Sequence, residues 1–153
     1  MVVGKPGSLL ADAIAEYEAR AQRYWPLEIV EVKEERAGKG VPISSVTLAE
    51  TDRLRERLPR GATVVALTRT GDATSSERLA RDIQGLAASG APGMAFLIGG
   101  AYGLSDQVLR NADRRLRLST MTLPHDFARL ILMEQLYRAG TITRGEPYHK
   151  ARE

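Results

Sequence analysis

The sequence predicts an α/β fold built on a mainly parallel sheet with helices on both faces. Two continuous apolar runs, at residues 62–68 and 93–100, have the length and composition of strands that are buried on both faces. Segments with the three-to-four spacing of amphipathic helices stand between the expected strands, so strands and helices alternate along the chain. The length of 153 residues fits one domain, residues 1–153, with a single core.

The first half of the chain begins with a short apolar segment, "MVVG". A helix is expected over residues 8–24, and Ser8 is placed to cap it. Apolar and charged residues alternate over 27–32, which predicts a half-buried strand, and the glycine-containing segment that follows is typical of a loop. An amphipathic helix is then expected over 47–58.

The second half repeats the strand-helix order twice more. The buried strand at 62–68 leads to a helix over 75–89, and the strand at 93–100 leads through glycines to a loop and helix at 101–112. The run "RRLRLSTMT" predicts the last strand with its exit loop, and a helix over 124–139 closes the domain.

The composition excludes several kinds of site. There is no cysteine and there are two histidines, so a disulfide framework and a thiolate metal site are excluded, and a structural zinc site is not expected. The N-terminus lacks the pattern of a secretion signal, and no apolar run approaches the roughly 20 residues of a membrane span. We therefore expect a soluble, cytoplasmic protein without membrane or metal partners.

The small net positive charge is concentrated near the C-terminus. Residues 110–153 hold nine Lys or Arg against five Asp or Glu. Such an excess is compatible with a phosphate-rich partner, although a solvated face is the commoner reason for an excess of this size.

Two motifs lie at carboxyl ends of expected strands, where open parallel sheets bind their ligands. The first, "IGGAYG" at 98–103, allows positive φ angles and close approach of a ligand, but it matches neither the dinucleotide nor the P-loop pattern, so a tight structural turn remains an alternative. The second, "STMTLPH" at 119–125, places Pro124 in the first turn of a helix, where Ser119 or Thr122 could meet free N–H groups. It is either a helix cap or a rigid loop that holds a small ligand by its backbone.

The closing helix is apolar almost all the way round, whereas a helix that meets only its own core needs one apolar stripe. We therefore expect it to be covered on two sides, by the sheet and by a second subunit. Glu134 and Arg138 are spaced to form an ion pair. His125 lies where the helix dipole disfavours the imidazolium, and it serves either substrate binding or structure.

The C-terminal segment "RGEPYHKARE" combines aromatic and cationic side chains. Arg144, Tyr148, His149 and Lys150 suit base stacking and phosphate contact, and a solubilising tail is the alternative.

Together, "FLIGGAYGL", "LSTMTLPHDFARLILMEQLYRA" and "YHK" resemble the bacterial ribosomal large-subunit pseudouridine N3-methyltransferase family of the SPOUT superfamily. The resemblance is close over residues 62–150, whereas the first half agrees in element order and in "AIAEYEARAQRY". The chain departs from the family at Thr68, where an acidic residue is usual, and it begins several residues short of the usual first strand. The resemblance implies an α/β fold with a C-terminal trefoil knot, a homodimer, S-adenosylmethionine bound in the knot, and a pseudouridine of 23S ribosomal RNA in the assembled ribosome as substrate.

The same resemblance implies three groups of site residues. The cofactor pocket is expected from Leu67, Gly100, Ser119, Thr120, Met121, Thr122, Leu123 and Pro124. Catalysis is expected from Arg138 and His149. Substrate contacts are expected from His125, Tyr148 and Lys150.

Methylation of a uracil-type N3 requires loss of a weakly acidic proton. The hypothesis is that Arg138 stabilises the developing anion and that His149 or water accepts the proton. A ribosome- or RNA-binding module without catalysis is the main alternative. A hydrolase that uses His125 with Asp126 is disfavoured, because adjacent helical side chains point about 100° apart and no serine or cysteine nucleophile is evident nearby.

Overall fold

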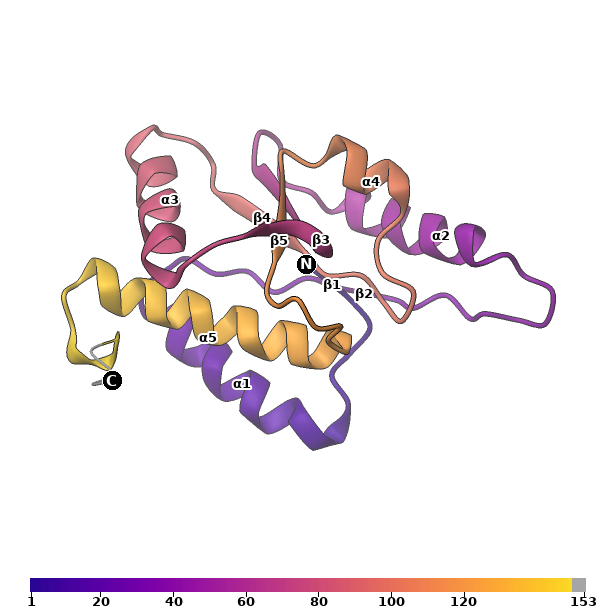
Figure 1. The fold of residues 1–153 in the computed structure, drawn as a ribbon, viewed down its shortest axis with the longest axis horizontal. Helices are drawn as coiled ribbons and strands as arrows, with labels where there is room; N and C mark the ends of the chain where they lie inside the picture. Colours follow the sequence, from indigo (N-terminus) through magenta and orange to yellow (C-terminus); the bar gives the residue numbers. More distant parts are fainter. Residues whose placement is uncertain (150–153) are drawn as a thin grey trace.

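The computed structural model describes residues 1–149, and of His149 only the backbone. Strands and helices alternate along the chain (Figure 1). The strands are β1 (Val2–Val3), β2 (Glu31–Val32), β3 (Thr63–Ala73), β4 (Met94–Leu97) and β5 (Arg114–Arg117). The helices are α1 (Ser8–Gln22), α2 (Ile43–Glu56), α3 (Ser76–Ala88), α4 (Asp106–Asn111) and α5 (His125–Thr143), followed by the 3-10 helix η1 (Pro147–His149).

All three strand pairings are parallel, which confirms the predicted sheet type. β3 lies between β4 and β5, and β1 pairs separately with β2. A bridge between Val2 and Ile98 joins the two sheets, and the Val3 N–H donates to the Ile98 carbonyl at 3.1 Å. β1 therefore lies beside the end of β4, although nearly a hundred residues separate them in the chain.

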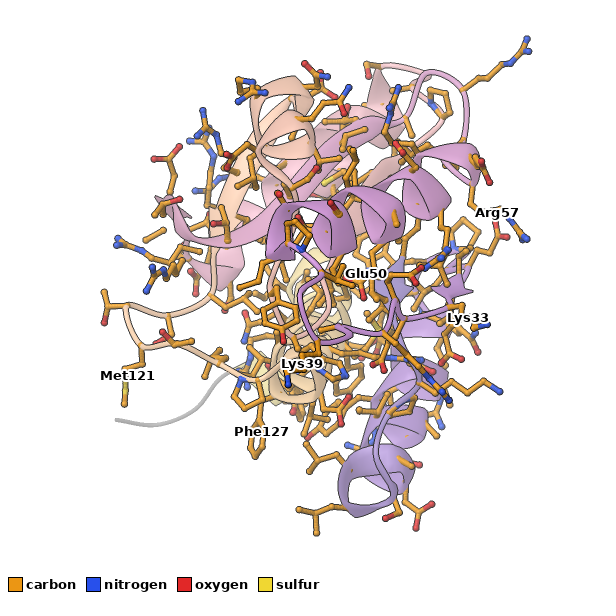
Figure 2. All side chains as sticks on the ribbon, turned by 90° about the vertical axis from the view of Figure 1, so that its right-hand side faces the viewer. Lys33, Lys39, Glu50, Arg57, Met121 and Phe127 are labelled. Atoms are coloured by element: carbon orange, nitrogen blue, oxygen red, sulfur yellow. The ribbon has the colours of Figure 1, made fainter. Side chains whose placement is uncertain are left out.

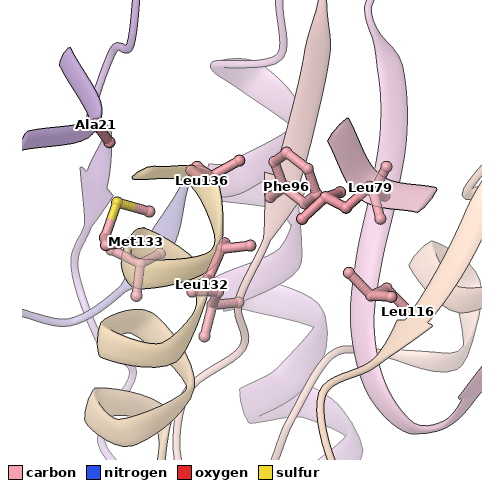
Figure 3. Packing of buried hydrophobic residues seen from close by; sticks show 10 residues of the cluster. Ala21, Leu79, Phe96, Leu116, Leu132, Met133 and Leu136 are labelled. Carbon is pink, nitrogen blue, oxygen red and sulfur yellow. The ribbon is translucent and has the colours of Figure 1, made fainter. Parts of the chain in front are cut away.

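Alternate residues of the strands face opposite layers of helices. Val65, Phe96 and Leu116 belong to the core cluster on one face, and Ala66 and Leu97 pack with α4 on the other. Figure 1 shows α1, α3 and α5 on the first side and α2 and α4 on the second, as the sequence predicts. Figure 3 shows the first cluster, to which the helices contribute Ala21, Leu79, Leu132, Met133 and Leu136.

β3 makes an excursion that the sequence does not predict. Leu67 and Asp72 are both register partners of Leu116, so the residues between them leave the ladder. Gly71, within this excursion, lies directly against β5, where a Cβ would come 2.7 Å from the carbonyl carbon of Arg115. Contacts of that length do not occur between real atoms of this kind, so the excursion can approach β5 only because position 71 is glycine.

The predicted strand at 27–32 is longer than the observed β2. Since β1 contains only two residues, β2 has a regular ladder partner only at Glu31 and Val32. Upstream of β2, the Val30 carbonyl accepts the N–H of Val2 at 2.9 Å. The side chains of Leu27 and Ile29 still pack against the core, which explains the alternating pattern.

Two helices are longer than predicted. α2 begins at Ile43, directly after Pro42, whose φ of −60° suits entry into a helix. α5 continues through Gly140 to Thr143. The absence of a side chain at Gly140 lets Tyr24 lie directly on the helix, so the glycine serves packing rather than termination.

The prediction that Ser8 caps α1 is wrong. Gly7 occupies the N-cap position and makes no side-chain cap, because it has none. The Gly7 N–H instead donates to Oδ2 of Asp126 at 2.9 Å, which joins the start of α1 to the start of α5.

Candidate functional site

The residues expected to hold a cofactor emerge at one edge of the sheet. Ala66 is the last β3 residue that pairs with β4, opposite Leu97, and Leu67 pairs with Leu116 of β5. Leu67 therefore lies at the level where β4 and β5 end. The structure thereby brings Leu67, Gly100 and the segment 119–124 to a common edge, where ligands of open parallel sheets bind. Two cavities of about 670 and 520 Å³ lie elsewhere and are lined by none of these residues.

The glycine motif forms a tight turn at this edge. The Gly103 N–H donates to the Gly100 carbonyl at 3.0 Å, and Gly103 has a φ of +78°. A Cβ at Gly99 would overlap the backbone of Gly103, and a Cβ at Gly100 would come 2.9 Å from Oε2 of Glu50. Gly99 is therefore required by the turn itself, whereas Gly100 leaves room for the Glu50 carboxylate. The turn offers backbone rather than side chains to a ligand.

The segment before α5 is also a backbone-rich loop. Ser119 Oγ accepts the N–H of Met121 at 3.0 Å, which stabilises the loop and not the helix. The predicted side-chain cap of α5 is absent: Pro124 is the residue before the helix, in an extended conformation, and no side chain caps the helix start. Thr120 and Thr122 are exposed.

His125 and Asp126 are neighbours at the start of α5, with His125 Nε2 3.1 Å from Asp126 Oδ1. Because the other oxygen of Asp126 already accepts the Gly7 N–H, the carboxylate has a structural partner in α1. The pair therefore does not resemble a hydrolytic centre, in agreement with the low weight given to that alternative.

Arg138 and Tyr148 meet at the other end of α5. Nε of Arg138 donates to Oε1 of Glu134 at 3.0 Å, which confirms the predicted pair, and the Tyr148 hydroxyl donates to the same oxygen at 3.1 Å. The guanidinium lies 5.0 Å from the Tyr148 ring centre, and the Tyr17 hydroxyl lies 3.4 Å from that of Tyr148. We call Tyr17, Glu134, Arg138 and Tyr148 the tail cluster.

The tail cluster is arranged so that Arg138 stays charged and Tyr148 stays protonated. The hydrogen bond with Glu134 raises the pKa of Arg138 above its usual value. Burial, followed by hydrogen bonding and the nearby Glu134 charge, raises the pKa of Tyr148. At neutral pH the cluster therefore offers a guanidinium and a phenol, both hydrogen-bond donors.

The structure does not bring the two groups of expected residues together within one chain. Arg138 lies fourteen residues beyond Pro124, and a helix rises about 1.5 Å per residue, so about 20 Å separates the tail cluster from the cofactor edge. Figure 1 shows α5 running from near the middle of the view to its left-hand side, where the helix ends. The side chain of His149 and all of Lys150 lie outside the described residues.

The second face of α5 is covered by α1 of the same chain, which corrects the expectation that another subunit is needed there. Arg129, only 4% exposed, donates to Glu18 of α1 at 2.8 Å and to Glu31 of β2 at 2.7 Å. Trp25, just beyond α1, donates from Nε1 to the Leu136 carbonyl at 2.8 Å.

Some large apolar side chains remain uncovered near the cofactor edge. Met121 is 73% exposed and Phe127 is 44% exposed. Figure 2 shows both side chains projecting outward from the loop and from the start of α5. Leu9, at the start of α1, is also exposed, so apolar surface gathers where α1 and α5 begin.

Glu50 is a residue of this edge that sequence reasoning missed. It is 4% exposed, its Oε1 accepts the Glu35 N–H at 3.0 Å, and its carboxylate packs against Gly100. Its position was visible in the sequence, because Val46, Glu50 and Leu54 share the four-residue spacing of one helix face. A carboxylate on the otherwise apolar stripe of this helix is the sequence feature that could have identified Glu50 as a candidate site residue.

The arginines of β5 differ in whether they form ion pairs. Arg114 pairs with Asp82 of α3 at 2.6 Å. Arg115 is exposed and Arg117 half-buried, and within residues 1–149 neither forms an ion pair. β5 is an edge strand, so this charge lies at the border of the sheet and close to the 119–124 loop.

Among the described residues, no group of three or more His, Asp or Glu side chains is placed to hold a metal ion. In the same part of the chain, no helix has the length and apolar character needed to cross a membrane.

Comparison with known proteins extends over almost the whole chain. Residues 1–149 match the model of a family described as "Predicted SPOUT methyltransferase". The chain is 50% identical to the Ribosomal RNA large subunit methyltransferase H of Gemmatimonas aurantiaca over 151 residues, which cover 98% of this chain and 97% of the relative. The proteins with that name from Syntrophotalea carbinolica and Clostridioides difficile are 46% and 41% identical, over 92% and 98% of this chain and 89% and 97% of their own.

Proposed function

Because the chain belongs to the SPOUT methyltransferase family, we propose that it transfers a methyl group from S-adenosylmethionine to N3 of a pseudouridine in 23S ribosomal RNA of the assembled large subunit. The observation that carries the proposal is the similarity of 41–50% identity, over nearly the full chain, to relatives named as ribosomal RNA large subunit methyltransferases. The resemblance of "LSTMTLPH" and "YHK" to the pseudouridine N3 family supports the finer assignment.

The cofactor edge fits a nucleoside cofactor. Its walls are the backbone of the 99–103 turn and the 119–124 loop, and Glu50 leaves a buried oxygen beside Gly100 without a hydrogen-bond partner in the described part of the chain. We assign Leu67, Gly100 and residues 119–124 to the cofactor. When bound, S-adenosylmethionine supplies the electrophilic methyl group. A trefoil knot in the C-terminal part of the chain is expected from its membership of the SPOUT family.

The tail cluster is assigned to the nucleobase. Methylation of N3 would require that N3 give up its proton, and the ring would then carry developing negative charge. Arg138 stabilises that charge: a guanidinium has five N–H donors, and Glu134 accepts only some of them. Tyr148 and Lys150 contact the nucleotide, His125 lines its approach, and His149 or water accepts the proton.

A homodimer would bring the cofactor edge of one chain and the tail cluster of another into one site. Since about 20 Å divides the tail cluster from the cofactor edge of its own chain, the C-terminal segment of one subunit would complete the site of its partner. The exposed Met121 and Phe127 at the cofactor edge supply apolar surface for such an interface. Each active site is then built from two chains.

The charge distribution supports an RNA substrate. Arg115 and Arg117 stand at the sheet border beside the proposed site, and cations there neutralise RNA phosphates. The cytoplasm is where assembled ribosomes are available.

One assay separates this proposal from a non-catalytic RNA-binding module. Calorimetry first measures binding of S-adenosylmethionine, and tritium transfer from the labelled cofactor is then compared between ribosomes and free RNA. We expect one cofactor per subunit and label in the large-subunit RNA of whole ribosomes. Ribosome binding without label would favour the non-catalytic module, and the position of label within digested RNA checks the nucleobase.

A further inference from the structure

Glu50 is a buried carboxylate that the proposed methyl transfer does not use. Oε1 accepts the Glu35 N–H, whereas Oε2 is buried and has no hydrogen-bond partner in the described part of the chain. Figure 2 places Glu50 on α2. A charged group in this position is unfavourable unless something compensates it.

The surroundings of Glu50 do not supply that compensation. Burial and the nearby Glu34 raise its pKa, which is the direction expected for an uncompensated carboxylate. The Arg53 charge acts in the opposite direction on that pKa, but its guanidinium donates to the side chain of Glu35 and to the Lys33 carbonyl. The carboxylate therefore has acidic neighbours and no cation of its own within residues 1–149.

The free oxygen faces the turn assigned to the cofactor. A Cβ at Gly100 would lie 2.9 Å from Oε2 and 3.1 Å from Oε1, so the carboxylate and the turn backbone are in direct contact. Unit charges about 10 Å apart still interact at the effective dielectric constant of about 20 that suits protein sites. A cation bound at the turn is within that range.

We propose that Glu50 is a positioning residue of the cofactor site, which supports the 99–103 turn and favours S-adenosylmethionine, with its sulfonium charge, over the product S-adenosylhomocysteine, whose sulfur is neutral. The inference rests on the proposed function. The two ligands have the same adenosyl and amino acid groups and differ in the methyl group and the sulfonium charge. Tighter binding of S-adenosylmethionine than of S-adenosylhomocysteine favours product release after each methyl transfer, because the product no longer has the sulfonium charge that the Glu50 carboxylate attracts.

The test compares the dissociation constants of the two ligands, measured by calorimetry, for the parent chain and Glu50→Gln. The amide keeps the shape and the acceptor for Glu35 but removes the charge. We expect binding of S-adenosylmethionine to weaken on the order of tenfold and binding of S-adenosylhomocysteine to change less than twofold. Glu56→Gln, an exposed position on the same helix, is the matched control and should change neither constant.

A purely structural role gives a different result. If Glu50 only supports the turn, both ligands weaken by the same factor, and the proposal is overturned; an unchanged pair of constants overturns it as well. Glu50→Asp keeps the charge with a shorter side chain and should preserve the ratio of the two constants even if both rise. Failure of the parent chain to bind either ligand would instead refute the proposed function, and this inference with it.

Discussion

Nε of Arg129 on α5 lies 2.8 Å from Oε1 of Glu18 on α1, and the same guanidinium reaches Glu31 on β2. One side chain therefore joins two helices and a strand. Removing a buried partner leaves carboxylates without their counter-charge, so we expect Arg129→Met to lower the free energy of unfolding by about 3 kcal/mol. Urea unfolding followed by fluorescence of Trp25, the single tryptophan, measures the loss.

The triple variant with Glu18→Gln and Glu31→Gln should recover part of that stability, because no uncompensated carboxylate remains. A loss below about 1 kcal/mol in Arg129→Met would show that the network contributes little.

The contact of Gly71 with β5 gives a second prediction. Gly71→Ala places a methyl group 2.7 Å from backbone atoms of Arg115 and Leu116, which cannot rotate away as a side chain would. We expect a loss of about 1–3 kcal/mol and a lower melting temperature by calorimetry. Gly85→Ala is the control, since nothing lies within 4 Å of its Cβ and the change within α3 should stabilise the chain by up to about 1 kcal/mol. Equal behaviour of the two variants would contradict the close packing.

The assigned role of Arg138 predicts a kinetic defect without a cofactor defect. Arg138→Ala should lower the single-turnover rate of methyl transfer on ribosomes roughly 100-fold, as loss of one stabilising donor does in other enzymes. Affinity for S-adenosylmethionine should stay unchanged. Arg20→Ala is the matched control, because Arg20 also stacks on Tyr17 but forms its ion pair with Glu16 rather than with Glu134. A near-normal rate for Arg138→Ala at saturating substrate would remove this residue from the mechanism.

The two-chain site predicts complementation between defective subunits. A chain truncated after Glu146 lacks Tyr148, and Thr122→Trp blocks the cofactor loop at an exposed position. Each homodimer should be inactive, whereas a mixed dimer should regain about one active site of two. Tritium transfer to ribosomes after co-expression with separate affinity tags measures the rescue, and its absence in purified mixed dimers would favour sites within single chains.

The border arginines predict a change in salt dependence. Each phosphate contact contributes roughly 0.7–0.9 to the slope of log affinity against log salt concentration. Arg115→Gln with Arg117→Gln should therefore flatten the slope for ribosome binding by about 1–2. Arg57→Gln with Arg60→Gln removes the same charge at the opposite end of the sheet and should leave the slope unchanged. Identical slopes for both double variants would assign the effect to net charge alone.

Local patterns predicted most of the fold, because the apolar runs at β3 and β4 and the helix periodicities depend on nearby residues. What they missed depends on distant partners. β2 is short because β1 offers only two residues to pair with, and the β3 excursion exists only in relation to β5. Gly140, a typical helix terminator, lies inside α5 because Tyr24 occupies the space beside it.

Local patterns also predicted part of the candidate site, and contacts between residues distant in sequence were again missed. Strand order alone brings Leu67, Gly100 and Ser119 to one edge, and helical spacing alone predicts the pair of Glu134 and Arg138. The contact between Arg138 and Tyr148 depends on a turn after Thr143 that spacing does not reveal. Glu50 was missed because its partner, Gly100, is distant in sequence.

The position of β1 has a consequence for the order in which the chain is made. Val2 needs Ile98 beside it, and translation adds about 5–20 residues per second, so the second strand neighbour of Val2 is synthesised roughly 5–20 s after Val2 itself. During that interval β1 lacks Ile98 as a neighbour and also lacks α5, which supplies Leu132, Met133 and Leu136 to the same core cluster. Chaperone contacts with the nascent chain should therefore concentrate before Ile98 emerges and decline once β4 is available.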